Sequence, residues 1–155
     1  MKIFLIAITS SCFFIACKKD KAPTKTELLT KSSWKYESGG VDQDRNGTVD
    51  ISFAATGLLQ PCILDNFGIF VSNGTGTSDE GATKCTPTAP QTAAFTWNFL
   101  NNEQNINISG SGLFGLGGQF KITTLTDAKF GISKDTTINL TGTPQTVGLI
   151  INLQH

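Results

Sequence analysis

Carboxylates at alternate positions form the clearest metal-binding pattern in this sequence. The stretch from Asp42 to Asp50 reads DQDRNGTVD, which is the Asp-x-Asp-x-Asn-Gly opening of a calcium loop with a further aspartate at its ninth position. Its twelfth position is Phe53, where such a loop carries a bidentate glutamate. The pattern therefore predicts at most a weak calcium site, formed by Asp42, Asp44, Asn46 and Asp50. The alternative is a solvated turn, because Asp and Asn also favour turns.

The first seventeen residues contain a second pattern with chemical meaning, an apolar run that ends in a cysteine. Met1-Lys2 precedes an apolar run that is shorter than the roughly 20 residues of a membrane-spanning helix. The run ends in Ala16-Cys17, and this order resembles the lipobox of bacterial lipoproteins. The resemblance implies that residues 1–16 are a signal peptide and that Cys17 is acylated. Several acyl chains would then hold the protein on the membrane.

The residue after Cys17 bears on the destination. It is Lys18 rather than an aspartate that would retain the protein at the inner membrane, so the resemblance implies delivery to the outer membrane of a bacterial cell envelope. The leaflet stays open. An ordinary signal peptide with an incidental cysteine is the alternative.

Two further cysteines, Cys62 and Cys85, lie in the exported part of the chain. They stand 23 residues apart, and the sequence contains no Cys-x-x-Cys motif. Because export compartments are oxidising, we predict a Cys62–Cys85 disulfide, which stabilises a domain by about 3 kcal/mol for a loop of this length. Two free thiols are the alternative.

The other titratable residues argue against catalysis. The single histidine is the last residue, His155, so this sequence holds no histidine-based zinc site or Ser-His-Asp triad. No acid stands on an apolar strand face, where burial would raise its pKa. Twelve basic and 12 acidic residues give a net charge of zero, which suits nucleic acid poorly. We predict a protein that is not an enzyme, needs no cofactor and binds no nucleic acid.

The elements that must position these residues are mainly strands. Thr24 and Glu27 have capping-box spacing, which predicts one short helix at about residues 26–31. From residue 34 onward, apolar and polar residues alternate, which predicts antiparallel strands with one buried face. The alternating sets are Trp34/Tyr36, Val49/Ile51/Phe53, Phe67/Ile69/Val71, Phe95/Trp97/Phe99, Ile106/Ile108, Phe120/Ile122, Phe130/Ile132 and Val147/Leu149/Ile151/Leu153. Short turn signals separate them, and this is typical of an all-β sandwich or barrel.

The stretch from Leu28 to Leu125 resembles the lipocalin-like domain of small bacterial lipoproteins. The pieces that carry the resemblance are, in order, Leu28-Leu29 with Ser33-Trp34-Lys35, Gln60-Pro61-Cys62 with Asp65 and Phe70, Asn73-Gly74-Thr75, Asp79 to Cys85, Thr96-Trp97, and Ile122 to Leu125. The resemblance implies an all-β fold: an eight-stranded antiparallel up-and-down barrel, or a half-open version, with one short N-terminal helix. Barrels of this kind often hold one small apolar molecule.

A set of aromatic residues from the alternating strands could form the wall of a ligand cavity. Its members are Trp34, Phe67, Phe95, Trp97, Phe99, Phe120 and Phe130. The alternative is a packed core, because small barrels fill their interiors with side chains. If Trp97 is buried, its indole N–H will need a hydrogen-bond partner.

The stretch from Gly110 to Gly115 matches Gly-x-Gly-x-x-Gly, but a strand rather than a helix follows it, which argues against a nucleotide site. We expect a flexible loop at the barrel mouth, where Leu113, Phe114 and Leu116 could cover a cavity or touch a partner. A plain connection with these side chains tucked in is the alternative.

The predicted organisation is a signal peptide (1–16), an acylated cysteine with a tether (17–25) and a lipocalin-like barrel (26–155). The predicted function is a non-catalytic, outer-membrane-anchored lipoprotein that binds a small apolar ligand. The alternative is a structural or interaction module of the cell envelope with a packed barrel and no ligand; the sequence names no protein partner.

Overall fold

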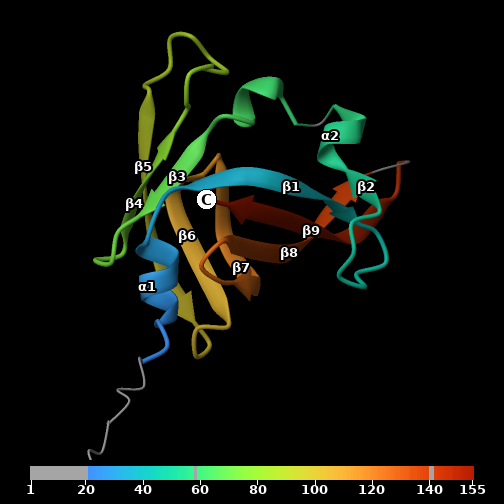
Figure 1. Ribbon diagram of the computed structural model, residues 1–155. Coiled ribbons are helices and arrows are strands. Elements are labelled where there is room, and N and C mark those ends of the chain that lie inside the picture. Colours follow the sequence, from blue (N-terminus) through green and yellow to red (C-terminus); the bar gives the residue numbers. More distant parts are fainter. Residues whose placement is uncertain (1–20, 58, 140–141) are drawn as a thin grey trace, which may run out of the picture.

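The computed structural model describes residues 21–57, 59–139 and 142–155 (Figure 1). Its elements are α1 (Lys25–Thr30), β1 (Trp34–Asp42), β2 (Ile51–Ser52), α2 (Phe53–Thr56), the 3-10 helix η1 (Pro61–Ile63), β3 (Phe67–Phe70), β4 (Thr75–Asp79), β5 (Thr92–Leu100), β6 (Asn105–Leu113), β7 (Leu116–Leu125), β8 (Lys129–Asn139) and β9 (Pro144–Gln154).

Helix α1 is set by the capping box that its sequence predicted. The Thr24 hydroxyl accepts from the Glu27 backbone N–H (3.2 Å), and the Glu27 carboxylate accepts from the Thr24 backbone N–H (2.6 Å). The Thr24 hydroxyl also donates to the Glu27 carboxylate (2.9 Å). The two bonds to the carboxylate lower the pKa of Glu27 from its ordinary value, the backbone bond most strongly. The helix begins one residue earlier than the predicted range and ends at Thr30.

Eight antiparallel strands form a closed, lipocalin-like barrel, which confirms the predicted all-β class. Strands β3 to β9 pair in sequence order, and β1 pairs with both β3 and β9, so the sheet closes on itself. Closure removes the exposed sheet edges that an open sheet would carry. The alternating apolar residues of β5, β6, β7, β8 and β9 supply the buried inner face.

The seam between β1 and β3 is short. Only Trp34 and Lys35 of β1 have partners on β3, whereas β1 pairs with β9 from Lys35 to Asp42, with one register shift between Tyr36 and Ser38. Farther along, Gly40 and Val41 pair with the two-residue strand β2. The structure therefore leaves part of β1 to be covered by something other than β3.

The alternation of Val49, Ile51 and Phe53 predicted a strand through Phe53, and this prediction is wrong. Only Ile51–Ser52 is strand, and Phe53 begins α2, which ends at Gly57 with a left-handed φ of 67°. Gly39 of β1 makes room for Phe53, because a Cβ there would lie 3.3 Å from the Phe53 ring and 2.6 Å from Ile150 O. Tertiary packing on the uncovered part of β1 thus overrides the local strand pattern.

The two ends of the barrel are built differently. The end at the start of β1 carries α1 and is called the closed end; α2 and β2 lie at the far end of β1 (Figure 1). That far end, called the mouth, is formed by the cover segment (residues 53–57 and 59–63), the β4–β5 connection and the β6–β7 hairpin.

Candidate functional site

Aromatic side chains fill the closed end. The Trp34 indole is fully buried, and its Nε1–H donates to Leu29 O (2.8 Å), which ties β1 to α1. Phe70 packs edge-to-face against Phe95 (5.1 Å between ring centroids) and Trp97 (5.7 Å). The Trp97 Nε1–H donates to Val71 O and Thr75 O, which supplies the partner its burial required.

The predicted cavity wall lies mostly in this packed region. Trp34, Phe95, Trp97, Phe120 and Phe130 belong to the buried core, and Phe99 packs against it. The prediction that Phe67 lines the cavity is wrong. Its neighbour on β3, Gly68, pairs with the inward-facing Trp34, so Phe67 points to the outer face of the barrel. A strand's alternation identifies two faces, but the sheet register decides which one is inside.

An apolar pocket of about 220 Å³ lies at the mouth. The cover segment supplies Phe53, Leu59 and Ile63, the β6–β7 hairpin supplies Phe114 and Leu116, and the barrel wall supplies Tyr36 and Ile151. It shares no residue with the predicted cavity wall. Of the pocket residues, only Phe114 and Leu116 are predicted from the sequence as side chains that could cover a cavity.

Tyr36 is the one polar side chain of this pocket. Its hydroxyl is sealed from water and has no hydrogen-bond partner among the described residues. Desolvation raises the pKa of Tyr36 above its ordinary value of about 10. An unpaired buried hydroxyl costs free energy, so this position is not optimised for stability.

A disulfide and a buried amide hold the cover segment in place. Cys62 of η1 is bonded to Cys85, with 5.2 Å between the Cα atoms, which confirms the predicted pair. The Asn66 side-chain amide is oriented so that its nitrogen donates to Cys62 O (2.9 Å) and Glu80 O (2.7 Å). Asp65 Oδ2 accepts from the backbone N–H groups of Ala82 and Thr83, both at 2.8 Å. The covalent bond and these hydrogen bonds fix Ile63 at the pocket wall.

A second cavity of about 420 Å³ lies beside the disulfide and has a polar wall that includes Asn66, Ser78 and Glu80. It shares Ile63 and Phe114 with the apolar pocket. The two cavities therefore meet at these two side chains.

The stretch from Gly110 to Gly118 is a hairpin, which corrects the expectation of a flexible loop. Strands β6 and β7 run through its glycines and pair up to Leu113 and Leu116. Gly110 and Gly112 adopt positive φ angles where the register between the strands shifts, so they accommodate a bulge. Leu113 is buried, while Phe114 and Leu116 are half-buried at the mouth.

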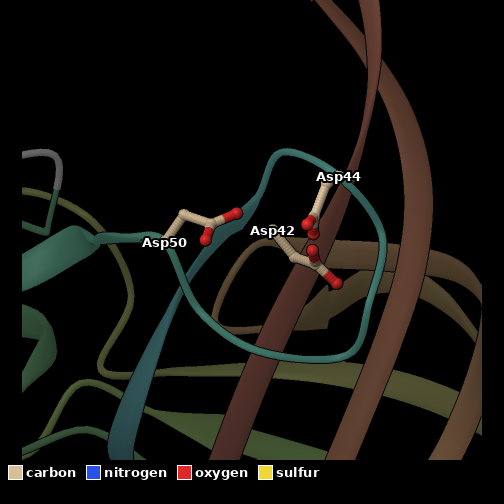
Figure 2. A group of neighbouring side chains, drawn as sticks. All are labelled: Asp42, Asp44 and Asp50. Atoms are coloured by element: carbon tan, nitrogen blue, oxygen red, sulfur yellow. The ribbon is translucent and has the colours of Figure 1, made fainter.

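The acidic loop does bring three carboxylates together (Figure 2). One oxygen each from Asp42, Asp44 and Asp50 lies within 4.8 Å of the others, a spacing that could hold a divalent cation. Asn46 closes the loop: its N–H donates to Asp42 Oδ1 (3.1 Å), while the Gly47 N–H donates to Asp42 Oδ2 (2.7 Å). Phe53 lines the apolar pocket instead of the loop. The carboxylates accept hydrogen bonds within the turn, and Asp42 is buried while Asp44 and Asp50 are exposed.

The predicted signal peptide and Cys17 lie outside the described residues. No helix in the described part of the chain is long and apolar enough to cross a membrane. The chain matches no protein-family model and no curated protein.

Proposed function

We propose that this chain is a lipid-anchored protein of a bacterial outer membrane whose lipocalin-like barrel binds a small apolar molecule at its mouth. The observation that carries the binding proposal is the apolar pocket, in which six of the seven wall residues are purely hydrophobic. Because none of the seven is a carboxylate, histidine or cysteine, the proposed role is binding without catalysis.

The size of the pocket limits the ligand. A dry apolar cavity of about 150 Å³ binds benzene, and pockets for drug-sized ligands run from about 300 to 1,000 Å³. At about 220 Å³, the mouth pocket suits a molecule little larger than benzene. Binding of such a molecule would remove apolar surface of both the ligand and the pocket from water, which is favourable.

The route of the chain supports access to this pocket. Residues 21–24 lead directly into α1, so a tether from Cys17 would reach the barrel at its closed end (Figure 1). The mouth lies at the far end of β1 and would face away from the anchoring membrane. Solutes in the surrounding compartment could then reach it.

The packed closed end favours a second candidate function. If the barrel serves only as a scaffold, the filled aromatic core is its purpose and the pocket is a packing defect. The protein would then be a structural or interaction module of the cell envelope.

Native mass spectrometry of the exported Cys17→Ser protein separates these candidates. We expect a bound mass that is lost on denaturation, or a rise in melting temperature when toluene is added to the bare protein. A bare mass together with no thermal shift by toluene would contradict ligand binding and leave the scaffold.

Membrane partitioning tests the anchor. Cys17→Ser should release the protein from the membrane fraction, because it removes the site of acylation. Cys12→Ser is the matched control, since this cysteine stands in the same leader and should leave partitioning unchanged. Retention of Cys17→Ser on the membrane would exclude lipid attachment at this residue.

A further inference from the structure

Two residues belong to the walls of both mouth cavities. Ile63 and Phe114 line both the apolar pocket and the polar-walled cavity. Rotation of either side chain would therefore change the shape of both cavities. Their joined volume lies in the range of about 300 to 1,000 Å³ that small-molecule sites occupy.

The second cavity offers acceptors and one negative charge. Glu80 lines it, and in the described part of the chain its carboxylate accepts only one hydrogen bond, from the Cys85 backbone N–H (3.0 Å). Ser78, on β4, also lines the cavity. A carboxylate with spare acceptor capacity favours a partner that donates hydrogen bonds, above all a cation.

Phe114 occupies a backbone conformation that suits another residue. It is the first of two residues in the β6–β7 hairpin, and both it (φ 54°) and Gly115 (φ 76°) have positive φ angles. Such turns favour Asn-Gly, and a bulky residue at positive φ is strained. The sequence therefore keeps a phenyl ring in the wall of both cavities at a cost in local stability, and such strain is common at ligand sites.

We propose that the two cavities form one bipartite site for an amphiphile, with Phe114 as a binding residue that both parts of the site share. The apolar body of the ligand occupies the pocket beside Tyr36, and a head group that donates hydrogen bonds, such as an amine, reaches Glu80. This inference rests on the proposed ligand binding and adds the chemical class of the ligand.

Calorimetry with three probes of equal chain length tests the proposal on the exported Cys17→Ser protein. Octylamine should bind about tenfold more tightly than octanol and more tightly still than octanoate, because only the amine brings a positive charge to Glu80. Glu80→Gln should abolish most of this preference while octanol binding stays within about threefold.

Phe114→Asn separates a binding role from a structural one. Asn-Gly fits the turn, so the melting temperature should stay the same or rise. Octylamine affinity should nevertheless fall about tenfold, because the shared wall is lost. Phe114→Leu keeps an apolar wall and is the matched control, with a smaller loss expected. If Phe114→Asn raises stability and leaves octylamine affinity unchanged, Phe114 is not a binding residue of this site.

The outcomes also distinguish this inference from the one it rests on. If the three probes bind equally and Glu80→Gln changes none of them, the bipartite site is wrong while ligand binding stands. If none of the probes binds and toluene also fails to stabilise the protein, the proposed binding function fails with it.

Discussion

The closed end and the mouth of the barrel are stabilised in different ways. At the closed end, Leu29, Trp34 and Phe130 are completely buried, and the Trp34 N–H is paired. At the mouth, a disulfide and hydrogen bonds hold a short cover segment over an incompletely filled space. The closed end is close-packed like a protein interior, while the mouth is held together by a cross-link and hydrogen bonds.

Several features that lower stability lie at the mouth, while the β5–β6 turn at the closed end also holds three non-glycine residues, Asn101, Asn102 and Glu103, at positive φ. The unpaired Tyr36 hydroxyl and the strained Phe114 turn both border the apolar pocket, and the unpaired Asp65 Oδ1 lies beside the disulfide loop. Natural proteins violate local rules mainly at functional sites. The closed end is thus the close-packed part of the barrel, and the mouth is the part that holds the proposed ligand site.

The largest expected effect comes from emptying the closed end. Trp34→Ala should lower the free energy of unfolding by about 3–5 kcal/mol, the usual cost of truncating a buried tryptophan. Phe53→Ala at the mouth should cost less than about 2 kcal/mol, because this half-buried ring already borders a cavity. Urea unfolding measures both values. Equal losses would mean that the two ends do not differ in this way.

Removing the disulfide should loosen only the mouth. We expect Cys62→Ser with Cys85→Ser to cost about 3 kcal/mol, since the cross-link restricts the unfolded chain. Hydrogen exchange should then speed up in residues 60–66 and 80–91 before it does in β8 and β9. Wild-type protein treated with dithiothreitol is the control and should behave alike. Uniform loss of protection would show that the disulfide supports the whole barrel.

Tyr36 provides a sharper test, because its hydroxyl is unpaired. Tyr36→Phe should stabilise the protein by about 1 kcal/mol, since it removes a buried group without a partner. A loss of stability in this variant would reveal a partner for the hydroxyl and weaken the assignment of the mouth as the sub-optimal end.

Alkaline pH gives the same residue an independent readout. Burial raises the folded pKa of Tyr36, so the folded protein holds this proton more tightly than the unfolded chain does. The stability that results from this difference is fully present below the unfolded pKa of about 10 and is lost as the pH rises through the folded pKa. Tyr36 is the only tyrosine, so tyrosinate absorbance reports on it alone. Tyr36→Phe should remove this part of the alkaline destabilisation, and an ordinary titration near pH 10 would contradict the burial.

Calcium should have the smallest effect. Both Asp42 oxygens already accept backbone N–H groups, which leaves fewer of their lone pairs for an ion. A site with a Kd of about 1 mM, saturated halfway, would contribute only about 0.4 kcal/mol. Differential scanning calorimetry with and without calcium measures this, with Asp44→Asn as the control. A shift of more than about 8 °C would make the loop a genuine metal site.

Sequence alternation predicted the all-β class and the resemblance to lipocalin-like domains implied the barrel, but neither located the pocket. Trp97 and Phe130 were correctly predicted to face inward, and the capping box at Thr24 and the Cys62–Cys85 pair were also correct. Phe53 and Phe67 were misplaced, because a period of two says that residues alternate without saying where the partner strand ends or which face it covers.

The sequence by itself determined the class of fold, the helix start and the covalent link, because each depends on local spacing or on residue type. The tertiary structure alone decided that Tyr36, Ile63 and Phe114 meet at the mouth. These residues come from three segments that are distant in the sequence. Their height, meaning their position along the barrel axis, depends on strand register and on the short β1–β3 seam. No local pattern encodes that height, since register is a property of all the paired strands together.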